Sequence, residues 1–341
     1  MQTLYVLLQA MRTRIKRSLN MLLAIFICIS LTPLFSACGT LQNIHVDRSV
    51  NTATPESACA KAYREAQHTQ HLIENAENNR NNKNSSADKW EKAAKTWKIV
   101  AKECPGRLSE SIVYNSKAQW AILSNESNNG NSQNNKNTNA DTDSQSTETN
   151  KISIAQKIEH EAYVNLIEVV NHYKNVKWTH QPLAQASAAE DKLAFILQTL
   201  AAKKIPGFPL EYSDIAMSNA ECLMHAAGEG ADLRKKIYDI PQKALESGIA
   251  QDPASGKDLP IAAIAYMDCA RAELTAFNQI IVIEENKTRS SAKNNRDETS
   301  YEYSAVQAHK AFKDAVIKLI TSRLLRAYAL GYPTETNLVL K

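Results

Sequence analysis

The spacing of apolar residues within residues 86–104 constrains the fold more than any other feature of this chain. Apolar side chains recur there at intervals of three and four residues: Trp90, Ala93, Ala94, Trp97, Ala101 and Cys104. That interval places side chains on one face of an α-helix. Pro105-Gly106 ends the pattern. A chain with such stripes folds by packing helical faces against one another.

Similar stripes recur along most of the chain, so we predict an all-α fold. Gly and Pro are scarce, at 9 and 10 residues, which favours long helices over turn-rich sheets. A helix over 231–249 is expected to be broken near Pro241. The expected helices cover residues 55–77, 86–104, 109–124, 152–174, 182–204, 213–227, 231–249, 259–284 and 300–329.

Polar, low-complexity sequence separates two helical regions. Residues 125–150 contain no large apolar side chain, and such a segment cannot bury enough surface to offset the entropy of ordering it. We therefore predict a disordered loop over 125–150, with a second polar and mobile stretch at 286–299. The loop divides N-terminal helical hairpins, 55–124, from a C-terminal helical region, 151–335. These two regions are either separate or continuous.

Two segments share a helix-turn-helix scheme with small residues facing back. Residues 93–123 show it, and residues 161–195 repeat it with a longer connector. This resembles tetratricopeptide-like helical hairpins, in which small residues allow close helix approach; here they are Ala94, Ala118, Ala162 and Ala188. The resemblance implies a solenoid of antiparallel hairpins. An irregular helical bundle is the alternative.

The N-terminus carries the parts of an export signal in order. A basic segment, RTRIKR at 12–17, precedes the apolar segment MLLAIFICI at 21–29, which is too short to be a typical spanning helix. Phe35-Ser36-Ala37-Cys38 then resembles the lipobox of bacterial lipoproteins. The resemblance implies a signal peptide over 1–37, cleavage before Cys38 and lipidation of its thiol. An uncleaved anchor, or an ordinary signal peptide beside an unrelated Cys, is the alternative.

If this lipobox is processed, residues 38–54 form a polar, lipid-anchored tether. The chain is then a cell-envelope protein on the extracytoplasmic side of a membrane. Gly39, rather than Asp, follows Cys38, which in this family implies the outer membrane where a cell has one.

The charge balance gives nucleic-acid binding no support. Four of the 40 basic residues precede position 38, which leaves 36 basic residues against 36 acidic ones in the processed chain. No basic block dominates that chain, and nucleic-acid binding relies on such blocks.

Four cysteines remain available once Cys38 is lipidated, an even number in an exported chain, which favours disulfides. Cys59 lies near the start of the first helix and Cys104 at the end of the second. If those helices pack antiparallel, the two thiols meet, so we predict a Cys59–Cys104 disulfide. Cys222 and Cys269 form a predicted second pair, which depends on their helices being neighbours. The alternative is that these cysteines stay reduced and buried.

Each sequence motif that comes close to a catalytic or metal site lacks a residue that such a site needs. His160-Glu161 begins a zinc-protease motif, but Val164 stands where its second His belongs. The nearby His68, His71 and Glu74 have no evident fourth ligand, and we expect Cys222 and His225 to pack structurally. Trp90, Trp97 and Trp120 are interpreted as core residues.

The sequence therefore predicts no catalytic residue, no metal or cofactor site and no cofactor. We expect a lipid-anchored binding or scaffolding protein whose partners are the membrane, through Cys38, and another envelope protein. The alternatives are a small-molecule or metal-binding envelope lipoprotein and an envelope enzyme.

Overall fold

The computed structural model of the chain describes residues 56–78, 86–130, 140–174, 176, 178–205, 207–294 and 299–340. Residues 1–54 and 55–341 separate into two units, and only the second contains described residues. The predicted signal peptide, the predicted tether and Cys38 therefore lie outside the described residues.

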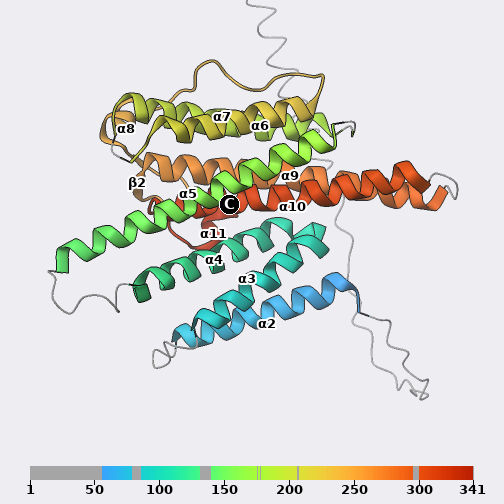
Figure 1. The fold of residues 1–341 in the computed structure, drawn as a ribbon, viewed down its shortest axis with the longest axis horizontal. Helices are drawn as coiled ribbons and strands as arrows, with labels where there is room; N and C mark the ends of the chain where they lie inside the picture. Colours follow the sequence, from blue (N-terminus) through green and yellow to red (C-terminus); the bar gives the residue numbers. More distant parts are fainter. Residues whose placement is uncertain are drawn as a thin grey trace, which may run out of the picture. The chain divides into compact units, whose positions relative to one another are not determined.

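Three helices open the described chain and pack around aromatic side chains (Figure 1). They are α2 (Ala58–Asn78), α3 (Ser86–Glu103) and α4 (Leu108–Gly130), with the 3-10 turn η2 (Pro105–Arg107) joining the last two. The stripe predicted within 86–104 is confirmed, because Trp90 and Trp97 are buried in this core. The Trp97 ring stacks on Tyr114, with centroids 4.6 Å apart, and Tyr63 meets its edge at 6.0 Å.

The predicted loop over residues 125–150 is wrong at both of its ends. Helix α4 continues to Gly130, and α5 (Ala140–His172) begins inside the segment; residues 131–139 lie outside the described part. The polar stretch at 286–299 is corrected in the same way, because α9 (Ile261–Asn294) runs into it. Each residue added to an existing helix gains a backbone hydrogen bond, so a helix can extend through sequence that would not start one.

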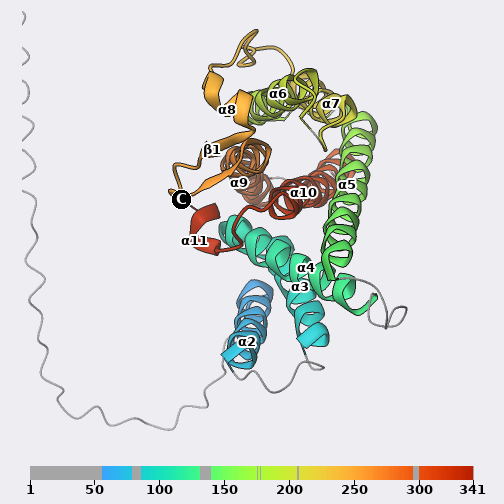
Figure 2. The same cartoon turned by 90° about the vertical axis from the view of Figure 1, so that its left-hand side faces the viewer.

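Helix α10 (Thr299–Ala329) lies at the centre of the helical unit. It packs against α4, α5 and α9, which surround it when viewed nearly end-on (Figure 2). Residues 319–328 are buried on every side of the helix. A helix buried all round is normally apolar, yet this one includes Arg323 and Arg326.

Small side chains join α6 (His180–Ala202) closely to α7 (Leu210–Ala227). Ala184 and Ala216 are fully buried, and the hydroxyl of Ser187 donates a 2.6 Å hydrogen bond to the carbonyl of Ala220. Helix α6 also packs on α9. It therefore lies between α7 and the central helices.

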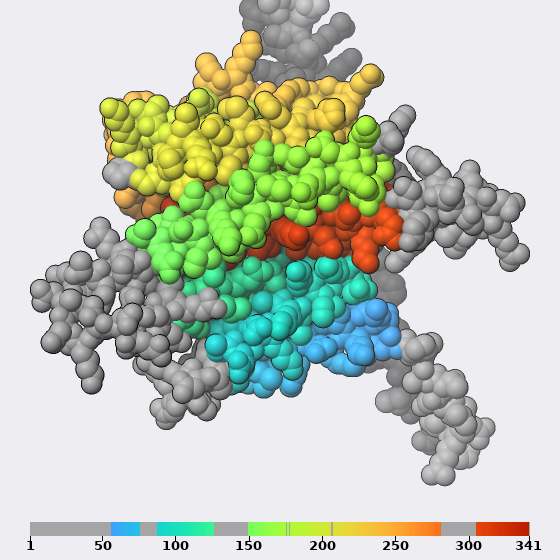
Figure 3. All heavy atoms as spheres, in the orientation of Figure 1, coloured from blue at the N-terminus to red at the C-terminus, as the bar shows by residue number. Residues whose placement is uncertain are grey.

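The helix pairings are those of an irregular all-α bundle. Helices α3 and α4 form an antiparallel pair, but α5 packs mainly on α10, while α6 pairs with α7 and α9. Figure 3 shows α5 crossing this face, with α10 visible between α5 and α4. The tetratricopeptide-like repeat is not confirmed. Regions 55–124 and 151–335 belong to one unit, and no helix in the described part of the chain is long and apolar enough to span a membrane.

The helix predicted over 231–249 is mostly wrong. Only α8 (Gln242–Ser247) is helical there; β1 (Ile249–Gln251) follows and pairs antiparallel with β2 (Asp258–Pro260). Pro241 immediately precedes α8, and Gly248, with φ +71°, ends it. Gly230 is also required, because a Cβ at this position would lie 2.3 Å from the ring of His180. Pro241 and Gly248 bound the short helix on either side, so residues 231–249 do not form a continuous helix.

Hydrogen bonds tie the hairpin and the C-terminal segment to α9. Arg271 of α9 donates to Tyr332 and to the carbonyl of Leu338, both at 2.6 Å; Leu338 lies on α11 (Thr336–Val339). Tyr332 in turn donates to the buried carboxylate of Asp252 at 2.7 Å. Burial alone would raise the pKa of Asp252, but hydrogen bonds from Tyr332 and Ser255 hold it below its usual value. This network fixes the position of α9, which contributes to the site below.

Candidate functional site

Arg323 lies at the centre of a fully buried group of charged side chains. Its Nη2 donates to both carboxylate oxygens of Glu190 at 2.7 Å, and its Nε donates to one of them at 3.0 Å. Its Nη1 bonds Glu159. Glu190 comes from α6 and Glu159 from α5, so this one guanidinium joins three helices. Its planar donors suit such paired carboxylates.

Arg326, one turn further along α10, shares a carboxylate with Arg323. Its Nε lies 3.1 Å from Oε2 of Glu159. The guanidinium carbon is 4.4 Å from the ring centre of Tyr212 and 5.2 Å from that of Tyr266. A cation stacked on aromatic faces interacts favourably with their π electrons, so both residues help to hold the buried charge.

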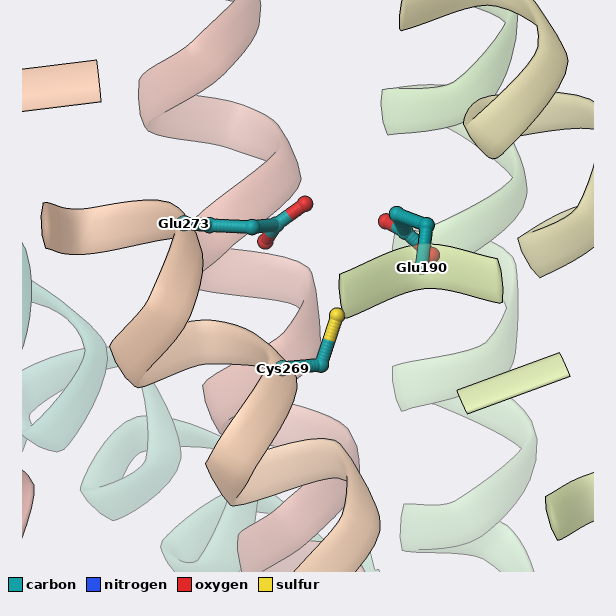
Figure 4. Close-up of side chains that lie close together, drawn as sticks. All are labelled: Glu190, Cys269 and Glu273. Atoms are coloured by element: carbon teal, nitrogen blue, oxygen red, sulfur yellow. The ribbon is translucent and has the colours of Figure 1, made fainter. Parts of the chain in front are cut away.

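Glu273 is a third buried carboxyl group, close to Glu190 but outside the arginine pairs. One of its oxygens lies within 4.8 Å of a Glu190 oxygen and of the Cys269 sulfur. Figure 4 shows the two glutamates facing each other, with Cys269 pointing between them. Neither Glu273 oxygen receives a hydrogen bond from a described residue. Burial, and then the negative charge of Glu190, raise the pKa of Glu273 well above its usual range.

The charges balance if Glu273 holds a proton. Arg323 and Arg326 then face the two carboxylates Glu159 and Glu190. A net charge in a low-dielectric interior costs several kcal/mol, so this neutral arrangement is the expected one at neutral pH. Cys269 also stays protonated, because burial raises the pKa of its thiol well above the usual value.

We predict that Glu273→Gln removes a pH dependence of stability. Folded Glu273 keeps its proton, whereas the unfolded side chain loses it above about pH 4.3. Where only the folded side chain is protonated, the free energy of unfolding of the wild type should fall by about 1.4 kcal/mol per pH unit. Gln, which has no proton to lose, should remove this slope. Urea unfolding between pH 5 and pH 9, in buffer with EDTA, measures the difference. Equal slopes for the two proteins would show that folded Glu273 is ionised.

The structure confirms one of the two predicted disulfides. Cys59 and Cys104 are bonded, with Cα atoms 5.0 Å apart, in the range that disulfide geometry needs. The second pair is wrong: Cys222 and Cys269 are free. Cys222 lies on α7 and Cys269 on α9, and α6 packs between these helices.

The other residues considered from the sequence lie apart from the buried cluster. His68, His71 and Glu74 are exposed on α2, and His160 is exposed on α5. Burial raises the pKa of Cys222 to about 11, which disfavours the thiolate that a nucleophile beside His225 would need. Among the described residues, the side chains whose ligand atoms lie close enough together to hold a metal ion are instead Glu190, Cys269 and Glu273.

The buried cluster was missed because its members occupy apolar stripe positions. Glu159 follows buried Ala155 by four residues and precedes buried Ala162 by three. Glu190 and Glu273 lie on the buried faces of α6 and α9 in the same way. A charged residue in line with an apolar stripe could have indicated a buried charge. The stripe of α10 carries the matching positive charges, Arg323 and Arg326.

No protein-family model, curated protein or solved structure matches this chain.

Proposed function

We propose that this chain is a lipid-anchored protein on the extracytoplasmic side of a bacterial membrane. The observation that carries the proposal is the order of basic segment, apolar segment and Ser36-Ala37-Cys38 at the N-terminus. The Cys59–Cys104 disulfide supports it, because disulfides persist mainly in oxidising compartments outside the cytoplasm. A tether of residues 38–54 reaches at most about 60 Å when fully extended. The helical unit then stays near the membrane.

We expect Cys38→Ser to release the chain from membranes, because the substitution removes the thiol that receives the lipid. Cys28→Ser is the matched control, since it also removes a thiol from the N-terminal segment but leaves Ser36-Ala37-Cys38 intact. Fractionation of cells that express each variant measures the membrane-bound share. The proposal fails if the Cys38→Ser chain is processed and still pellets with the membranes.

The activity that best fits the helical unit is binding of another envelope protein. The charged side chains of the buried cluster pair with one another inside the fold, so they are unavailable to a substrate at the surface. Several large apolar side chains are exposed instead, and Ile237, in the loop after α7, is the most exposed of them at 77%. Ile237 therefore offers an exposed apolar position at which contact with a protein partner can be tested.

Photo-crosslinking in living cells tests this binding role. A photoreactive residue at Ile237 is expected to give a discrete crosslinked product that disappears in the Cys38→Ser background, because the partner lies at the membrane. Ile99 on α3 is exposed at 48% and serves as the control position on another helix. A chain that crosslinks to nothing from either position, while it stays membrane-bound, would contradict a protein-binding role.

A further inference from the structure

Three buried side chains with metal-binding atoms converge between two helices of the bundle. Glu190 comes from α6, and Cys269 and Glu273 come from α9, four residues apart on one face. Their ligand atoms all lie within 4.8 Å of one another, as Figure 4 shows. Two oxygens or an oxygen and a sulfur on one tetrahedral zinc ion lie about 3.4–3.7 Å apart, given usual bond lengths. Small side-chain rotations would bring the three atoms to that spacing.

Unsatisfied polar atoms beside these side chains point independently to a ligand. Glu273 is fully buried and directed at the cluster, yet neither of its oxygens receives a hydrogen bond from a described residue. Asn219 of α7 is also fully buried, and its Oδ1 has no partner while its Nδ2 lies 3.5 Å from Glu190. Buried polar groups normally have partners. A cation bound by the cluster would supply that partner to Glu273 and would contact Glu190, the residue beside which Nδ2 of Asn219 lies.

The charges of the whole cluster would stay balanced around a divalent ion. Arg323 and Arg326 already balance the carboxylates of Glu159 and Glu190. A thiolate on Cys269 and a carboxylate on Glu273 would together balance the two charges of a divalent ion. The interior therefore gains no net charge, which is the main obstacle to placing a cation there.

We propose that Glu190, Cys269 and Glu273 bind a divalent transition-metal ion of the zinc class that joins α6 to α9. A thiolate together with carboxylates suits zinc, whereas magnesium and calcium bind oxygen ligands alone. The ion stabilises the bundle, and the unpartnered Oδ1 of Asn219 or an enclosed water molecule supplies the fourth ligand that a structural zinc ion normally has. This inference is independent of the lipid anchor and of the proposed partner.

Zinc content after refolding tests the site. Full-length chain in detergent, with its disulfide intact, is unfolded in urea with EDTA, refolded with zinc chloride and desalted. Refolding is needed because the cluster is closed in the folded protein. Elemental analysis should find about one zinc ion per wild-type chain, and at least about a tenfold lower content in Glu273→Gln and Cys269→Ser. Cys222→Ser, which removes the free thiol of α7, should match the wild type.

Cobalt adds a readout specific for the thiol. Wild-type chain refolded with cobalt should show near-ultraviolet thiolate-to-metal absorption, which Cys269→Ser removes and Cys222→Ser keeps. Circular dichroism verifies that each variant is helical. If Cys269→Ser does not fold, the zinc content of Glu273→Gln alone tests the proposal. Wild-type chain without zinc, or a folded Glu273→Gln chain that keeps its zinc, would overturn the proposal.

Discussion

Replacing Arg323 with Met is expected to destabilise the helical unit by roughly 3–5 kcal/mol, because the substitution leaves buried carboxylates without their cation. Met preserves much of the side-chain length, so the loss reports charge more than volume. Arg323 is fully buried and bonds both Glu190 and Glu159, which are themselves fully buried. Urea unfolding at pH 7 measures the change in the free energy of unfolding.

An exposed ion pair supplies the control for Arg323. The Arg234 side chain also donates three hydrogen bonds to a single carboxylate, that of Asp232, but at the surface. Arg234→Ala should therefore cost less than about 1 kcal/mol. Adding Glu190→Gln to Arg323→Met should recover part of the loss, because it removes one unpaired charge. Equal, small effects for Arg323→Met and Arg234→Ala would mean that the buried cluster does not hold the bundle together.

Replacing both Cys59 and Cys104 with Ala is expected to destabilise the α2–α4 region by about 4 kcal/mol on the chain-entropy model, for a sequence separation of 45 residues. The bond joins the start of α2 to the end of α3, so its loss frees the ends of both helices. These helices share a small core with α4 that is separate from the main one. We expect this region to unfold at lower urea concentration than the rest of the bundle.

The other cysteines make the disulfide prediction specific. Cys222→Ala removes a half-buried free thiol and should shift the unfolding midpoint only slightly. Reducing agent should lower the midpoint of the wild type to that of the double Ala variant and leave the variant unchanged. A wild type whose unfolding is insensitive to reducing agent would show that the bond contributes nothing to stability.

Apolar periodicity predicted most of the helices because most of them bury one face. The stripe within 86–104 predicted α3. Together with the helix before it, the stripe also predicted that Cys59 and Cys104 meet. The hairpin of β1 and β2 was not predictable in the same way. Its strands have three residues each, which is too short for an alternating pattern to be recognised, and the positive φ of Gly248 that ends α8 is a backbone property.

The buried cluster depends on tertiary packing, so helical spacing alone could not assemble it. Glu159 and Arg323 are 164 residues apart, and each becomes informative only when the other is known to lie opposite it. The failed Cys222–Cys269 pair has the same origin. Both residues lie on apolar faces of their helices. However, α6 packs against α7 through small side chains and so lies between α7 and α9.

The most direct test of the proposed membrane anchoring is the intact mass of the chain purified from bacterial membranes without reducing agent. We expect a polypeptide that begins at Cys38, carries lipid on that residue and is lighter by two hydrogens than the fully reduced form, because Cys59 and Cys104 are bonded. Reduction should add those two hydrogens and leave the lipid in place. A membrane-bound chain that retains residues 1–37, or one that begins at an unmodified Cys38, would contradict the account.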